Sequence, residues 1–371
     1  MTTTTSRDRL RAARQRTGEA GLDALLLAPG AELRYLTGLD ATASERLTAL
    51  VLPREGEPTL IVPRLERPGA EAAGVADLGV TVVDHGDDQD AHRMAIDAMG
   101  PATGGPRTVG VSERMWASHW FALTGVEPHL RLRMAGEVLS PMRVVKSDVE
   151  IAELATAAEA IDRVHEQVPA MLRPGRTETE VAADIASAIL AAGHTEVSFV
   201  IVASGPNGAG PHHGVGDRRL ADGDVVVVDI GGTVASGYGS DCTRTYCLGR
   251  PPADFLGPYA ALRDAHRAGI EAVRPGVTAA SVDAAARAVL VDAGYGDHFI
   301  HRSGHGIGLD GHEEPYIVSG NATVLRPGMA FSIEPGVYLP GRYGARIEDI
   351  VVCTDSGVRR LNTLSTELTI V

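Results

Sequence analysis

Four carboxylates and one histidine in the second half of the chain could bind divalent cations. They are Asp229, Asp241, His305, Glu334 and Glu348, and each lies in a short motif typical of a metal ligand. Four carboxylates and an imidazole form a mostly oxygen donor set, which suits a pair of divalent cations better than one tetrahedral zinc ion. The four negative charges would balance two doubly charged ions and so lower the cost of burying them.

An internal repeat groups these carboxylates. A stretch that begins with Arg-Pro-Gly, continues through an alanine-rich run and ends at a glycine occurs at residues 173–193 and again at 274–294, an offset of 101 residues. Further on, Asp229 matches Glu334 at an offset of 105, and the next pair of carboxylates matches at 107. Because a duplicated unit folds into two similar halves, we expect matching carboxylates to meet near a pseudo-twofold axis.

Histidines are concentrated in two glycine-rich stretches. His301, His305 and His312 lie within twelve residues of one another, and His212 and His213 follow a proline in a Gly/Pro-rich loop. Glycines let the backbone approach a site closely. We interpret His213 as a solvated loop residue, the usual situation of a loop histidine, whereas the surrounding motifs favour a functional role for the other histidines.

The elements that must position these residues divide into two domains. The N-terminal part is predicted to be α/β, with a helix over 7–20 and short apolar strands over 24–27, 47–52, 59–62, 80–83 and 108–111. Residues 139–146 are predicted to cross between domains, and a capping box from Ser147 to Glu150 then opens a long helix. We therefore predict domains over residues 1–146 and 147–371. A second capping box opens a helix at Thr177, and apolar strands are predicted over 199–203 and 225–230.

Composition is that of a water-soluble enzyme. The 371 residues are 44% hydrophobic and carry a formal net charge of −14, which argues against a nucleic-acid partner. The first apolar run, residues 22–28, is too short to cross a membrane. Three cysteines form no disulfide framework or zinc motif, which indicates a reducing compartment and a cytoplasmic location.

The chain resembles the metallopeptidases that include Xaa-Pro dipeptidases (prolidases), aminopeptidases P and methionine aminopeptidases. The matching motifs, in order, are Asp229-Ile-Gly-Gly, Ser240-Asp-Cys-Thr-Arg-Thr245, His301-Arg-Ser-Gly-His-Gly-Ile-Gly-Leu309 with His312-Glu-Glu-Pro315, Ile333-Glu-Pro-Gly336 and Arg346-Ile-Glu-Asp349. The resemblance implies an α/β (α+β) protein with a C-terminal pita-bread fold built on a pseudo-twofold repeat. The stretch Glu32-Leu-Arg-Tyr-Leu-Thr-Gly38 resembles the smaller creatinase-like α/β domain that precedes it in proline-directed members.

The resemblance also implies the roles of individual residues. The five donors match the ligands of two divalent metal ions, Mn²⁺ in the first place and Co²⁺ or Zn²⁺ otherwise, with Asp241 and Glu348 bridging. Glu334 matches the general base. Three histidines match residues of the substrate pocket, and one arginine matches a side chain beside the metals: His212, His301, His312 and Arg346. The implied partners are a small peptide with proline at its second position and a second copy of the chain in a homodimer.

Two departures from the family pattern affect this interpretation. Asp229 and Asp241 are twelve positions apart, one more than in many members. An extra residue in the turn between two strands is tolerated, whereas a shift of register would point Asp241 away from the metals. Tyr316, which we expect with Arg346 near the substrate or beside the metals, occupies the position at which some prolidases carry an arginine that grips the carboxylate of the dipeptide. Arg302, Arg342 or an arginine of the N-terminal domain could replace it.

Several functions compete on these observations. We expect hydrolysis of the bond between an N-terminal residue and proline, with an Xaa-Pro dipeptidase favoured slightly over an aminopeptidase P acting on longer peptides. A metal-free hydrolase of the creatinase type and a non-catalytic pita-bread binding module are disfavoured, because the ligand set is complete. A methionine aminopeptidase is disfavoured because a whole domain precedes the catalytic one.

Overall fold

The computed structural model describes residues 3–102 and 104–371, with side chains described from Ser6 onward. The chain divides into two compact units, Met1–Arg143 and Val144–Val371. The boundary predicted from the sequence follows residue 146, whereas the division by contacts follows Arg143. Each unit is described by itself below.

A mixed six-stranded sheet forms the centre of the N-terminal unit, with strand order β4-β3-β2-β1-β5-β6. The predicted strands all form, with ends shifted by at most two residues: β1 (Ala24–Leu27), β2 (Ala49–Pro53), β3 (Thr59–Pro63), β4 (Thr81–His85) and β5 (Thr108–Val111), followed by β6 (Arg131–Met134). Strand β1 is antiparallel to β2 and parallel to β5. It is buried along its whole length, which explains its uninterrupted apolar sequence.

Helices cover this sheet: α1 (Thr3–Glu19), α2 (Ala31–Thr37), α3 (Arg67–Ala72), the 3₁₀ turn η1 (Val75–Leu78), α4 (Ala91–Ala98), α5 (Ala117–Val126) and α6 (Gly136–Arg143). Helix α6 includes the first part of the segment 139–146 that was predicted to cross between the domains. Pro141 lies inside the helix. Val138 and Leu139 are buried in the unit, so their packing outweighs the helix-breaking tendency of the proline.

Two sheets and a ribbon build the C-terminal unit. The first sheet has the order β17-β9-β8-β7, the second the order β11-β10-β12-β15-β16, and β13 pairs with β14. The strands are β7 (Glu196–Ser204), β8 (Val225–Thr233), β9 (Cys242–Cys247), β10 (Gly304–Gly306), β11 (Glu313–Ile317), β12 (Ala330–Ile333), β13 (Gly336–Leu339), β14 (Tyr343–Arg346), β15 (Asp349–Thr354), β16 (Gly357–Arg360) and β17 (Thr369–Ile370).

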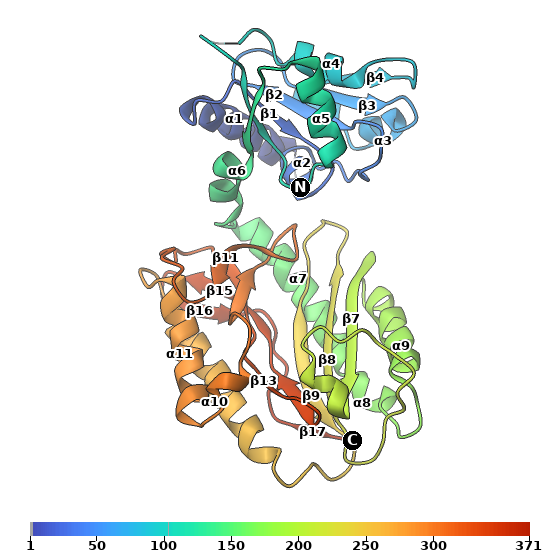
Figure 1. Ribbon diagram of the computed structural model, residues 1–371, viewed down its shortest axis with the longest axis vertical. Coiled ribbons are helices and arrows are strands. Elements are labelled where there is room, and N and C mark those ends of the chain that lie inside the picture. Colours follow the sequence, from blue (N-terminus) through green and yellow to red (C-terminus); the bar gives the residue numbers. More distant parts are fainter. Residues whose placement is uncertain (1–2, 103) are drawn as a thin grey trace. The chain divides into compact units, whose positions relative to one another are not determined.

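The helices of this unit lie on the outer sides of the sheets (Figure 1). They are α7 (Asp148–His165), α8 (Val168–Met171), α9 (Glu178–Ala191), α10 (Leu256–Ala272) and α11 (Ala279–Asp292), with 3₁₀ turns η2 (Gly205–Ala209) and η3 (Gly296–His298). Both predicted capping boxes form: Ser147 and Glu150 exchange hydrogen bonds at the start of α7, and Thr177 and Glu180 do so at the start of α9.

The internal repeat is present in the fold. Helices α9 and α11 each have 14 residues, and both begin and end at the offset of 101 read from the sequence (279 − 178 and 292 − 191). Each is capped by the matching threonine, Thr177 or Thr278. The two helices lie on opposite flanks of the unit, with the strands between them (Figure 1). The duplicated sequence thus forms two halves whose strands meet in the middle.

Candidate metal centre and substrate pocket

Strands β8 and β9 present two of the carboxylates on one face. Asp229 lies opposite Thr243 in the antiparallel register, so Asp241, two positions before Thr243, projects to the same side as Asp229. The backbone N–H of Ser240 donates to the carbonyl of Gly232 at 2.8 Å, so the pairing continues past Asp241. The extra residue of the twelve-residue spacing therefore falls in the turn beyond this pair and leaves the register intact.

Burial explains why Asp229 faces the centre of the unit. Its neighbours Val228 and Ile230 belong to the buried core beneath helices α7 and α9, which also includes Ile161 and Val181. Because side chains alternate along a strand, the carboxylate must point to the opposite face. The alternation that buries the valines thus aims Asp229 at the other half of the repeat.

The second half supplies the remaining three donors. His305 lies within β10, Glu334 directly follows β12, and Glu348 directly precedes β15. Strand β12 pairs with both β10 and β15, which brings these side chains together. Glu348 also donates its backbone N–H to the carbonyl of Thr243 at 3.1 Å, so a bridge between the halves fixes the centre.

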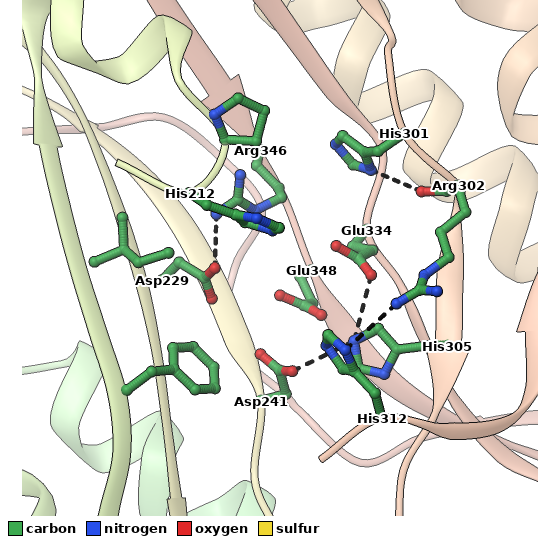
Figure 2. Close-up of a pocket in the computed structure, with 13 residues that line it drawn as sticks. His212, Asp229, Asp241, His301, Arg302, His305, His312, Glu334, Arg346 and Glu348 are labelled. Atoms are coloured by element: carbon green, nitrogen blue, oxygen red, sulfur yellow. Dashed lines mark hydrogen bonds and ion pairs between the residues drawn. The ribbon is translucent and has the colours of Figure 1, made fainter. Parts of the chain in front are cut away.

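All five predicted donors converge (Figure 2). Three sets of donor atoms each lie within 4.8 Å of one another: Asp229, Asp241 and Glu348; His305, Glu334 and Glu348; and Asp241, His305 and His312. Asp241, His305 and Glu348 each occur in two of the sets, so the donors form one connected cluster rather than separate sites. The Nε2 atom of His305 lies 3.5 Å from Oδ2 of Asp241 and 3.4 Å from Oε1 of Glu334.

The electrostatics of the cluster call for cations. Burial, and then repulsion from neighbouring carboxylates, raises the pKa of Asp241 and of Glu348 well above the ordinary range. Burial likewise raises the pKa of Glu334 to about 7. Oδ1 of Asp229 and Oε1 of Glu348 are buried and have no hydrogen-bond partner among the residues that the structure describes. Buried acceptors require a donor or an ion, so the donor set fits divalent cations.

The orientation of the His305 imidazole also fits a bound cation. Its Nδ1 lies 3.1 Å from the carbonyl oxygen of Gly306, which can only accept, so Nδ1 carries the proton. Burial, and then the proximity of His312, lowers the pKa of His305 to about 3. The neutral ring therefore presents the lone pair of Nε2 to the carboxylates, an arrangement that is favourable when a cation lies between them.

Arg346 holds Asp229 from behind. It is 3% exposed, and its Nη2 lies 2.6 Å from Oδ2 of Asp229. Its other nitrogens donate to the hydroxyls of Tyr338 at 2.8 Å and of Thr243 at 3.1 Å. Thr243 in turn donates to Oε2 of Glu348 at 2.8 Å. Sequence patterns did not indicate these roles of Tyr338 and Thr243, although the position of Thr243, two residues after Asp241, was a usable signal.

A pocket of about 530 Å³ opens onto the cluster. Besides the five donors it is lined by Phe199, Ile201, Pro211, His212, His301, Arg302, His312 and Arg346. His301 donates from Nδ1 to the carbonyl of Arg302 at 2.7 Å, and its Nε2 lies 2.9 Å from the hydroxyl of Tyr338. Burial lowers the pKa of His301 to about 4, so the ring is neutral. The three predicted pocket histidines thus share one cavity with the metal-binding cluster.

Two side chains near the pocket, Tyr316 and His213, lie in surroundings that differ from those expected from the sequence. Tyr316 does not line the pocket; the guanidinium of Arg302 lies over its ring, 4.5 Å from the centroid, while Arg302 itself faces the cavity. His213 is not a freely solvated loop residue. Its Nε2 lies 2.8 Å from Oε2 of Glu178, a fully buried carboxylate on helix α9. The expectation for His213 was wrong because the loop folds back on a helix start far away in the sequence.

Comparison with known proteins agrees with this geometry. Residues 152–355 match metallopeptidase family M24, and residues 9–145 match the creatinase/prolidase N-terminal domain. The chain is 53% identical over 366 residues to the probable dipeptidase PepE of Mycobacterium tuberculosis, covering 98% of this chain and 96% of the relative. It is 34% identical over 354 residues to the Xaa-Pro dipeptidase of Lactobacillus delbrueckii subsp. lactis, covering 94% and 95%.

A solved structure is similar over the whole length. The crystal structure of dipeptidase PepE from Mycobacterium ulcerans has a TM-score of 0.93 and 54% sequence identity, covering 100% of this chain and 99% of that one. The chain therefore belongs to metallopeptidase family M24, whose pita-bread fold is preceded here by a creatinase-type N-terminal domain. Among the described residues, no helix is both long and apolar enough to span a membrane.

Proposed function

We propose that this metallopeptidase is an Xaa-Pro dipeptidase. The observation that carries the proposal is the convergence of four carboxylates and His305, with two unpartnered buried acceptors, at the floor of a pocket lined by histidines and an arginine. Asp229, Asp241, His305, Glu334 and Glu348 would hold two divalent ions. The names of the two relatives, dipeptidase and Xaa-Pro dipeptidase, support the same substrate class.

The residues divide the chemical work. Divalent ions held by these donors would supply a water molecule of lowered pKa and a positive charge that polarises the scissile carbonyl. Glu334 is the general base, since its carboxylate borders the cavity and belongs to the cluster. His212, His301 and His312 line the cavity and are the groups available to stabilise charge that develops on the carbonyl oxygen. Arg346 holds the carboxylate of Asp229 in place through its ion pair.

Selection of proline follows from shape rather than from hydrogen bonding. An Xaa-Pro bond has no N–H, so a site that depends on that donor cannot hold it. One side of the cavity is apolar, formed by Phe199, Ile201 and Pro211. These side chains can receive the pyrrolidine ring by van der Waals contact.

Preference for a dipeptide follows from Arg302. Of the two arginines that line the cavity, Arg346 is paired with Asp229, whereas Arg302 forms no ion pair among the described residues. Its Nη2 is 3.4 Å from Nδ1 of His312, and Tyr316 supports its guanidinium from below. Two divalent ions would neutralise the four carboxylates, which leaves the cation of Arg302 to receive the free carboxylate of a dipeptide.

Three finer points belong to the same proposal. The metal is Mn²⁺ by preference, because the donors are mostly carboxylate oxygens.

The chain forms a homodimer, and the exposed side chains of Trp116 and Phe121, 46% and 76% accessible, give it apolar surface to bury. The protein acts in the cytoplasm, where its three buried cysteines stay free thiols. Light scattering tests the dimer, since a monomer at micromolar concentration would reject it.

A panel of substrates tests the function. The Mn²⁺-loaded enzyme is assayed with Ala-Pro, Ala-Ala and Ala-Pro-Ala under one set of conditions. We expect hydrolysis of Ala-Pro with kcat/KM well above that for the other two. Equal rates on Ala-Pro and Ala-Ala would reject proline selectivity. A higher rate on Ala-Pro-Ala would replace the dipeptidase by an aminopeptidase of the same specificity.

A further inference from the structure

The loop that carries His212 is held by a buried carboxylate outside the metal cluster. Glu178, the first residue of helix α9, is fully buried and lies away from the pocket lining. Its Oε1 accepts hydrogen bonds from the backbone N–H and the hydroxyl of Ser204 at 2.8 and 2.6 Å and from Asn207 at 3.0 Å. Its Oε2 accepts from Nε2 of His213 at 2.8 Å. These donors span the loop from its first residue to the neighbour of His212.

Glu178 is a carboxylate rather than a protonated acid. Burial alone would raise its pKa, but the hydrogen bonds from Ser204, His213 and Asn207 outweigh burial and hold the pKa of Glu178 below its ordinary range. An ionised carboxylate only accepts, so Nε2 of His213 carries a proton and donates. Hydrogen bonds to an ionised, buried acceptor are among the strong ones in a protein.

The far end of the same loop is tied to the same helix turn. Glu178 donates its backbone N–H to the carbonyl of Arg218 at 3.1 Å, and Thr179 donates to the carbonyl of Gly216. The opposite side of the loop packs against strand β14, where a side chain on Gly344 would collide with the carbonyl oxygen of Gly208. Strand β14 ends in Arg346, so the loop is clamped between α9 and the strand that leads to the metal cluster.

We propose that the Glu178–His213 pair is a positioning device that fixes the place of His212 at the pocket. His212 itself is exposed and lines the cavity, where Figure 2 shows its ring among the other pocket residues. Its ring forms no hydrogen bond with the described part of the chain, so its position depends on the backbone of the loop. The Glu178–His213 hydrogen bond holds the backbone of the loop next to His212. The inference rests on the proposed function, in which His212 contacts the substrate.

A double-mutant cycle between His212 and His213 tests the device. His213→Leu removes the donor at similar size, whereas His213→Gln retains an N–H near the position of Nε2. We expect His213→Leu to lower kcat/KM for Ala-Pro about tenfold, mainly through KM, the size of one lost charge-assisted hydrogen bond. His213→Gln should recover most of that loss. In the His212→Ala background, His213→Leu should change kcat/KM by less than about twofold, because the two act as one unit.

Two further measurements separate positioning from a general loss of stability. Hydrogen exchange of residues 205–218 should speed up in His213→Leu and in Glu178→Gln, with manganese content unchanged. The control is Ile189→Val, a buried change on the same helix that should lower Tm without altering KM. A tenfold loss that persists in the His212→Ala background, or unchanged exchange of the loop in His213→Leu, would overturn the inference. If the wild-type enzyme does not cleave Ala-Pro, the proposed function fails, while the exchange measurement still decides whether the pair holds the loop.

Discussion

Replacing Arg302 by glutamine should remove the preference for a free C-terminal carboxylate. Arg302 lines the pocket, is half-buried and forms no ion pair within the described residues. Glutamine keeps a polar side chain of moderate length but carries no charge. The change therefore isolates the attraction between the guanidinium and the substrate carboxylate from the remainder of the pocket.

The size of the effect follows from the partial exposure of the arginine. A hydrogen bond between charged groups contributes about 1.5–3 kcal/mol, and the lower end applies to a site that solvent can reach. About 1.4 kcal/mol corresponds to a tenfold change in an equilibrium constant. We therefore expect kcat/KM for Ala-Pro to fall about tenfold in Arg302→Gln, almost entirely through KM.

Ala-Pro amide is the matched substrate, because its C-terminus is neutral and nearly isosteric. The wild-type enzyme should handle the amide about tenfold less well than the dipeptide, and Arg302→Gln should handle both about equally. Tyr316→Phe keeps a ring beneath the guanidinium and should resemble wild type. An equal fall on dipeptide and amide would refute the reasoning, because it would assign Arg302 a structural role instead of recognition of the carboxylate.

Three other outcomes follow from the same geometry. Glu334→Gln should lower kcat for Ala-Pro by about 100- to 10,000-fold, the range of general acid–base catalysis. The measurement is a steady-state assay at saturating Mn²⁺, and a near-normal kcat would reject the assignment of Glu334 as the general base. Asp349→Asn should lower the unfolding free energy by about 3 kcal/mol in urea, because Arg244, 2.6 Å away, stays buried without its partner; a change below about 1 kcal/mol would contradict this. Burial, and then Arg244, lowers the pKa of His165 from 6.5 to about 3. The folded protein should therefore lose stability as pH falls from 6.5 toward 3, by up to about 1.4 kcal/mol per pH unit. Urea unfolding of His165→Gln should show a weaker dependence of the unfolding free energy on pH.

Much of the fold could be predicted from the periodicity of the sequence and from its internal repeat. The offset of 101 residues predicted two equivalent helices, and α9 and α11 have those bounds. The position of Asp229 in a predicted apolar strand and the glycines around His305 indicated a functional site. These signals are local, because each depends on residues within one strand, one turn or one repeat.

The features of the site that could not be predicted from the sequence depend on contacts between distant segments of the chain. Glu178 looks like an ordinary residue in the first turn of a helix, yet its partners Ser204 and His213 lie 26 and 35 residues further along the chain. Tyr338 follows an apolar strand pattern, and only the folded chain brings its hydroxyl to His301 and Arg346. No spacing rule links such residues, since a loop can return to any exposed helix start.

Titration of the metal-stripped protein with Mn²⁺ tests the central claim most directly. Bound manganese and Ala-Pro hydrolysis are measured on the same samples, for the wild type and for Asp241→Ala, which removes a donor common to two of the atom sets. We predict that activity rises with bound manganese and saturates near two ions per chain, and that Asp241→Ala binds less than this and loses nearly all activity. Full hydrolysis of Ala-Pro by the stripped protein, or two ions bound and normal turnover in Asp241→Ala, would contradict the account.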